Sequence, residues 1–109
     1  MSAVSNEVGD RRNWTFLTNH AHVLLAIART PDLRLRDIAD LVGITERTAM
    51  QIIADLEQDG YVTREREGRR NRYRVDLRHP LRHPLEQHHD IADLVTAISH
   101  RDPERRPAS

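Results

Sequence analysis

The apolar residues of this chain change their spacing at Gly60, and few folds accommodate that change. Before Gly60, apolar side chains recur every three or four residues, which is the period of helices that bury one face. After it, Val62, Tyr73 and Val75 lie in two segments rich in β-formers with a period of two. Gly68 lies between these segments and can take the positive φ of a tight turn. The pattern predicts helices followed by a β-hairpin within one domain.

Proline, glycine and threonine divide the helical part of the chain. The residue before Pro31 avoids the helical region, so the first helix should end there. Gly43 breaks the second helix, and the hydroxyl of Thr45 can cap the third. The predicted elements are a helix at 14–29, a short strand at 33–36, helices at 37–42 and 45–59, a hairpin at 61–76, and a last helix from Pro84 onward.

The segment DIADLVGITERTAMQIIADLE, residues 37–57, resembles the helix-turn-helix signature. Ala39 is the small residue that lets two helices approach, and Gly43 allows the turn that a Cβ would obstruct. The apolar positions of that signature are matched by Ile38, Val42, Ile44, Ala49 and Ile52. The continuation LEQDGYVTREREGRRNRYRV is similar to the MarR and ArsR groups of bacterial winged-helix regulators.

This resemblance covers residues 13–78 and implies a mainly helical α+β fold, the winged helix-turn-helix. The expected organisation is a mobile tail at 1–12, the winged domain at 13–78, a linker and dimerisation helix at 79–100, and a disordered tail at 101–109. The chain has no cysteine, so the thiolate metal sensing of many ArsR-group proteins cannot be carried over to it.

The charges of the chain are neutral in sum and separated in sequence. Seventeen arginines balance seventeen acids, and there is no lysine. Residues 32–60 carry seven acids and three arginines, a net charge of −4, whereas residues 61–78 carry seven arginines and three acids, a net charge of +4. A positive field confined to one hairpin suits a focused contact with a polyanion.

The resemblance implies that the helix at 45–59 enters the major groove of double-stranded DNA, with the arginine-rich wing at 64–74 on the backbone or in a minor groove. Arg47 has the geometry to pair with guanine and Gln51 with adenine. The predicted DNA-binding residues are Thr45, Glu46, Arg47, Thr48, Gln51, Arg66, Arg69, Arg70, Asn71 and Arg72.

Several of these arginines have a structural alternative. Arg47 also fits a solvated helix surface, and Arg64 and Arg74 could pair with nearby carboxylates instead of DNA. Tyr61 and Tyr73 are predicted to be core residues rather than stacking platforms for bases.

A homodimer on a palindromic operator is expected, because one recognition helix reads too few base pairs for useful specificity. The second apolar stripe of the first helix and the apolar face of the last helix are the predicted contacts. These residues are Phe16, His20, Val23, Ile27, Ile91, Leu94, Val95 and Ile98. The hypothesis includes an unknown small-molecule effector, bound between the first and last helices at the dimer interface.

Histidine raises the alternative of a metal site. Five of the seven histidines lie in residues 79–100, and His89, Asp93 and His100 share one stripe of the predicted last helix. Surface or interface roles are the simpler interpretation, so no metal or other cofactor is predicted.

Other classes of protein are less consistent with the sequence. No nucleophile–base pair, glycine-rich phosphate loop or paired carboxylate indicates an enzyme. No apolar run has the length of a signal peptide or a membrane span, so a cytoplasmic protein without membrane contacts is expected. The alternative function is a winged-helix module that binds protein rather than DNA, although such a module would not need a net charge of +4 in eighteen residues.

Overall fold

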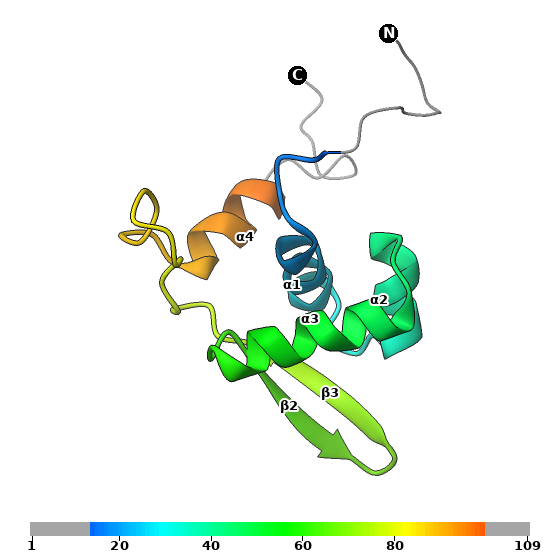
Figure 1. Cartoon of the computed structure of the whole chain (residues 1–109). Helices are drawn as coiled ribbons and strands as arrows, with labels where there is room; N and C mark the ends of the chain where they lie inside the picture. Colours follow the sequence, from blue (N-terminus) through cyan, green and yellow to red (C-terminus); the bar gives the residue numbers. More distant parts are fainter. Residues whose placement is uncertain (1–13, 100–109) are drawn as a thin grey trace, which may run out of the picture.

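The computed structural model describes residues 14–99 and contains helices packed against a two-stranded hairpin (Figure 1). The elements, labelled as in Figure 1, are α1 (Asn19–Arg29), α2 (Leu35–Val42), α3 (Glu46–Gln58), β2 (Val62–Glu67), β3 (Arg70–Val75) and α4 (Ile91–Ser99). The predicted fold class, a mainly helical α+β winged helix-turn-helix, is confirmed. Predictions for the tails at 1–12 and 101–109 lie outside the described residues.

The first helix begins later than the sequence predicted. Thr18 has an extended backbone, and its hydroxyl accepts a hydrogen bond from the Ala21 amide at 3.2 Å. This cap ends the helix on its N-terminal side, so α1 starts at Asn19 rather than Trp14. Trp14 and Phe16 precede the helix and stack edge to face on each other, with ring centroids 5.0 Å apart.

The short strand predicted at 33–36 does not form. The Asp37 carboxylate accepts a hydrogen bond from the Arg34 amide at 3.2 Å, and this contact draws Leu35 and Arg36 into the first turn of α2. The second helix therefore begins at Leu35, two residues before the predicted start. Within residues 14–99, β2 and β3 make up the whole sheet.

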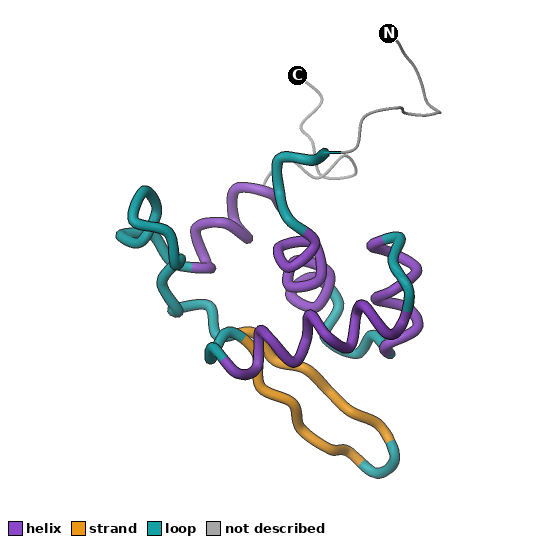
Figure 2. The backbone as a smooth tube through the Cα atoms, in the orientation of Figure 1, coloured by secondary structure: helices purple, strands orange, loops and turns teal. Residues whose placement is uncertain are grey.

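The turn between α2 and α3 follows the prediction. Gly43 has a φ of +85°, and its amide donates to the Ala39 carbonyl at 2.8 Å. The Thr45 hydroxyl then accepts a hydrogen bond from the Thr48 amide at 3.0 Å and caps α3. In Figure 2 the two helices are joined by this short loop, and α3 crosses the face of the molecule above the hairpin.

The hairpin also agrees with the sequence. The strands pair antiparallel, from Val62 opposite Val75 to Glu67 opposite Arg70. Gly68 supplies the positive φ of the turn, at +62°.

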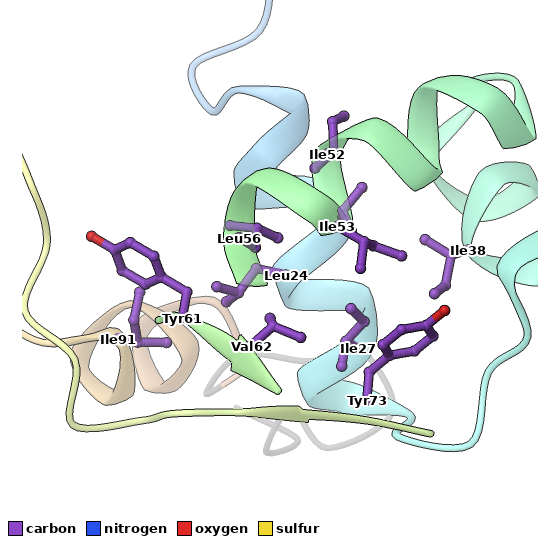
Figure 3. Close-up of a cluster of buried hydrophobic side chains, with 11 residues drawn as sticks. Leu24, Ile27, Ile38, Ile52, Ile53, Leu56, Tyr61, Val62, Tyr73 and Ile91 are labelled. Atoms are coloured by element: carbon purple, nitrogen blue, oxygen red, sulfur yellow. The ribbon is translucent and has the colours of Figure 1, made fainter. Parts of the chain in front are cut away.

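One apolar core joins all of these elements (Figure 3). Ile52, Ile53 and Leu56 of α3 face α1 and the base of the hairpin. Tyr61 and Tyr73 are buried in the same cluster, so their predicted core role is confirmed. The other members are Val23, Leu24, Ile27, Ile38, Val62 and Ile91.

The last helix was predicted to start at Pro84, and that boundary is wrong. The segment before α4 folds back on itself, since the Leu81 amide donates to the His89 carbonyl and the Ile91 amide to the His79 carbonyl, both at 3.0 Å. These bonds close a loop, and α4 begins only at Ile91. Among the described residues, no helix is long and apolar enough to cross a membrane.

Candidate nucleic-acid interface

The outer face of α3 is polar and open to solvent. Its buried side places Ala49, Ile52 and Ile53 in the core. The opposite side exposes the five residues predicted to contact DNA from this helix, Thr45, Glu46, Arg47, Thr48 and Gln51. Within residues 14–99, Arg47 makes no ion pair, so its guanidinium is available to a ligand. The Thr45 hydroxyl is already engaged with the Thr48 amide and hydroxyl.

Three acids lie in the C-terminal half of α3 and at its C-cap, and each is paired with a side chain from another part of the fold. Asp55 lies 2.9 Å from His20 of α1. Glu57 lies 3.2 Å from Arg64 of β2. Asp59 lies 2.9 Å from Arg82, which follows the hairpin. These acids lie at the C-terminal end of the helix, so the exposed N-terminal face of α3 is free of their carboxylates.

Two wing arginines are held by the loop between α1 and α2. Arg70 donates from Nη2 to the Asp32 carbonyl at 2.6 Å. Arg72 lies 2.9 Å from the Asp32 carboxylate and 3.1 Å from that of Glu67. Arg72 was predicted to contact DNA, and these two ion pairs compensate its charge in the single chain.

The rest of the wing differs from this pattern. Arg66 donates to the Gly68 carbonyl at 3.2 Å and so supports its own turn. Arg74 lies 4.0 Å from Glu65, a loose and exposed pair. Arg69 at the tip makes no ion pair with any residue between 14 and 99. At the tip, the guanidinium of Arg69 is therefore unpaired among the described residues, and Asn71 is exposed nearby in the sequence.

Asp32 was missed as a residue of this site. It lies 38 positions before Arg70, and no periodicity or local motif connects the two. The only signal in the sequence was the charge separation between residues 32–60 and 61–78, which indicates attraction without naming a pair.

Three predicted dimer contacts are corrected. Val23, Ile27 and Ile91 are 0%, 1% and 3% exposed within the single chain, so they have no surface left for a partner. Phe16 and Ile98 are 92% and 46% exposed. Leu94 and Val95 are half-buried, and His20 is exposed but paired with Asp55.

The histidine-rich segment does not form a metal site among the described residues. His89 Nδ1 and Asp93 Oδ2 share a hydrogen bond of 2.8 Å, and that bond lowers the pKa of Asp93. His100 lies outside the described residues. Within 14–99, no group of three or more histidines and acids could hold a metal ion.

A helix with one buried and one free face, followed by an arginine-rich hairpin, defines a winged helix-turn-helix protein. Residues 15–72, just over half of the chain, match the sequence model of the MarR family. The chain belongs to the MarR family, and the predicted resemblance to this group of winged-helix regulators is confirmed.

Comparison with individual proteins gives less information than the family match. No curated protein matches the chain. Among solved structures, it is similar to MepR, a transcription regulator of the Staphylococcus aureus multidrug efflux pump MepA. The identity is 21% and the TM-score 0.49, over 53% of this chain and 45% of that chain. The match thus spans less than half the length of MepR, and the family assignment rests on residues 15–72 alone.

Asp32→Asn tests how the wing is held. The substitution keeps the size of the side chain and removes the charge that pairs with Arg72. Because an exposed ion pair contributes about 0–1 kcal/mol, the free energy of unfolding should change by less than about 1 kcal/mol. Amide hydrogen exchange at the wing tip should nevertheless accelerate.

The matched control is Asp40→Asn, an exposed carboxylate of α2 that makes no ion pair among residues 14–99. It should leave exchange in the wing unchanged. Equal exchange at the tip for wild type and Asp32→Asn would show that Asp32 does not order the hairpin.

Proposed function

We propose that this protein is a homodimeric, sequence-specific regulator of transcription that binds double-stranded DNA. The observation that carries the proposal is that Arg47 on α3 and Arg69 at the wing tip are exposed and make no ion pair among residues 14–99. A helix of this size fits the major groove, and a basic hairpin beside it fits the backbone or a narrow minor groove. Membership of the MarR family supports the same function.

In this proposal α3 reads the bases. Arg47 can donate two hydrogen bonds to guanine, and Gln51 can pair with adenine, because both side chains are exposed on the outer face. Thr48 reaches phosphate or a thymine methyl. Glu46 either accepts a hydrogen bond from cytosine or repels a misplaced phosphate. The wing residues Arg66, Arg69, Arg70, Asn71 and Arg72 contribute mainly to register and affinity.

The alternative is a winged-helix module that binds a protein. Such a module would keep the apolar core and the fold, but its affinity for a partner would not require a guanidinium at the tip of the wing. The two functions differ in how binding to DNA depends on salt, because only phosphate neutralisation releases counterions from DNA. A regulator that binds DNA must be in the compartment that contains the DNA, which agrees with the predicted cytoplasmic location.

The test of DNA binding is fluorescence anisotropy with a labelled duplex over a range of salt concentrations. Each phosphate contact contributes a slope of about −0.9 to log K against log salt. We expect a steep slope for the wild type and a slope flattened by about one unit for Arg69→Ala. The control is Arg78→Ala, which removes the same charge from an exposed residue beyond the far end of the hairpin.

Arg78→Ala should leave the slope close to that of the wild type. No binding at about 50 mM salt, where phosphate contacts are strong, would remove DNA as the direct partner. The protein-binding module would then be the better explanation.

The proposed dimer uses apolar side chains that the single chain leaves exposed. Trp14 and Phe16 stack on each other ahead of α1 and are 63% and 92% exposed. Ile98 near the end of α4 is 46% exposed. In Figure 1 the chain ahead of α1 passes beside the end of α4 in this view. A palindromic operator would match the twofold symmetry of such a dimer.

Sedimentation velocity tests the dimer. Phe16→Asp and Ile98→Asp each place a charge in the proposed interface, and burying an unpaired charge is strongly unfavourable. Both variants should sediment as monomers at concentrations at which the wild type is a dimer. Leu85→Asp, at a residue 77% exposed in the loop before α4, should remain dimeric. Dimers of unchanged strength in the first two variants would place the interface elsewhere.

An effector site is proposed in the cleft between the first and last helices. The cleft has a volume of about 670 Å³ and is lined by Leu24 of α1, Leu56 of α3 and Leu94 of α4, with the His20–Asp55 pair at its edge. Polar side chains, among them Arg82 and Glu86, line it together with these leucines, so the cleft would suit an amphipathic small molecule. The residues that line the cleft belong to a single chain, whereas the sequence analysis expected the effector at the dimer interface.

Thermal melting with a panel of aromatic and amphipathic compounds tests this site. A ligand at 100 times its Kd stabilises the native state by about 2.7 kcal/mol, so a bound compound should raise the Tm measurably. Leu94→Trp fills the cleft and should abolish the shift, whereas Leu85→Trp should retain it. A flat panel for the wild type would count against an effector in this cleft.

A further inference from the structure

A groove separates α3 from the wing and has a cationic rim. Its volume is about 600 Å³. Apolar side chains of Leu35, Ile53 and Tyr73 form its lining, together with the exposed Met50. In Figure 1 this is the region where α3 passes above the hairpin. The groove thus extends from Met50 of α3 to Arg69 and Arg70 of the wing.

Three arginines on the rim keep their charge. Arg34, Arg69 and Arg70 line the groove, and none of them is paired with a carboxylate among residues 14–99. Arg70 donates to the carbonyl of Asp32, which is a neutral acceptor. The one acid in the groove, Glu57, is paired with Arg64. The rim is therefore positive, with Arg34 contributed by the N-cap of α2 and the other two arginines by the wing.

We infer that Arg34 binds a phosphate of the DNA strand that runs through this groove, between the base-reading helix and the wing. The inference rests on the proposed DNA binding and adds a third element, the start of α2, to the interface. The sequence did not single out Arg34, because it lies outside both the helix at 45–59 and the wing at 64–74. Its role follows from its position opposite Arg69 and Arg70.

The chemistry of the groove matches a sugar–phosphate strand. Deoxyribose presents apolar carbon atoms that can lie on the lining of the groove, and the phosphates on either side accept hydrogen bonds from the guanidinium groups of the rim. An acidic peptide has a similar combination of charge and apolar surface. DNA is favoured because the groove is continuous with the exposed outer face of α3, through Met50.

The affinity for phosphate has to come from the guanidinium of Arg34 rather than from the end of α2. The first turn of that helix already has the Asp37 carboxylate, which accepts the Arg34 amide at 3.2 Å. An anion at the helix end would meet this negative charge. The side chain of Arg34 can reach away from Asp37 into the groove, where only Glu57 is acidic and is already paired.

Arg34→Ala and Arg36→Ala form a matched pair. Arg36 lies two residues later, in the first turn of α2. It is exposed, makes no ion pair among residues 14–99 and does not line the groove. Each variant removes one positive charge from nearly the same place, so the long-range field of the protein changes equally. Only Arg34→Ala removes the proposed contact.

The experiment is anisotropy of a labelled random-sequence duplex with the full chain across salt. Arg34→Ala should flatten the slope of log K against log salt by about 0.9, the value for one lost phosphate contact. Arg36→Ala should leave the slope within error of the wild type. Arg34→Lys retains the charge and should recover most of the slope, and the Tm of each variant checks that the fold is intact.

The other outcomes overturn the inference in different ways. Equal flattening by Arg34→Ala and Arg36→Ala would mean that α2 acts only through its general field. A wild-type slope for Arg34→Ala, beside a flattened one for Arg69→Ala, would remove Arg34 and leave the proposed function standing. Absence of DNA binding by the wild type would remove both. If polyglutamate, but not the duplex, bound with a dependence on Arg34, the groove would be a site for acidic protein.

Discussion

The burial of one face of α3 against α1 determines where every candidate contact lies. Ile52 and Ile53 are 3% and 2% exposed, and truncating a buried isoleucine costs about 2–5 kcal/mol. An exposed ion pair contributes only about 0–1 kcal/mol. The apolar contacts therefore decide which side of α3 faces outward, and the ion pairs adjust the charge of a helix whose orientation is already set. Gly43 and Thr45 also help to set the orientation of α3, because they fix where the helix begins.

The chain is neutral overall, but part of its surface is positive because several of its acids are paired with other side chains. Asp55 is bound by His20, and Glu57 and Asp59 are each bound by an arginine from outside α3. Each pair is weak by itself, but together they tie the C-terminal half of α3 to α1, to β2 and to the segment after the hairpin. The arginines that are not paired with a carboxylate keep their full positive charge at the surface. Net charge was a poor guide here, because the pairing of charges, and not their sum, determines the field near the surface.

Local signals in the sequence predicted most of the fold. The helical period, the glycines at 43 and 68, and the Thr45 cap depend on neighbours within a few residues, and each was confirmed. The errors had two sources, one in local hydrogen bonds that the apolar pattern does not show and one in contacts with distant residues. Thr18 and Asp37 moved two helix starts through single hydrogen bonds. Val23 and Ile27 were assigned to a partner because the pattern marks them as apolar, and it cannot say which surface of the chain covers them.

The same limit explains why the wing was only partly understood. A two-stranded hairpin is marginally stable in water by itself. Its base is fixed by the burial of Val62 and Tyr73 in the core, but its tip is held by exposed contacts to Asp32, which lies 38 residues before Arg70. The base is therefore rigid and the tip is held weakly. A wing of this kind can adjust to a DNA backbone at low cost, since the contacts that it would give up are worth about 1 kcal/mol or less each.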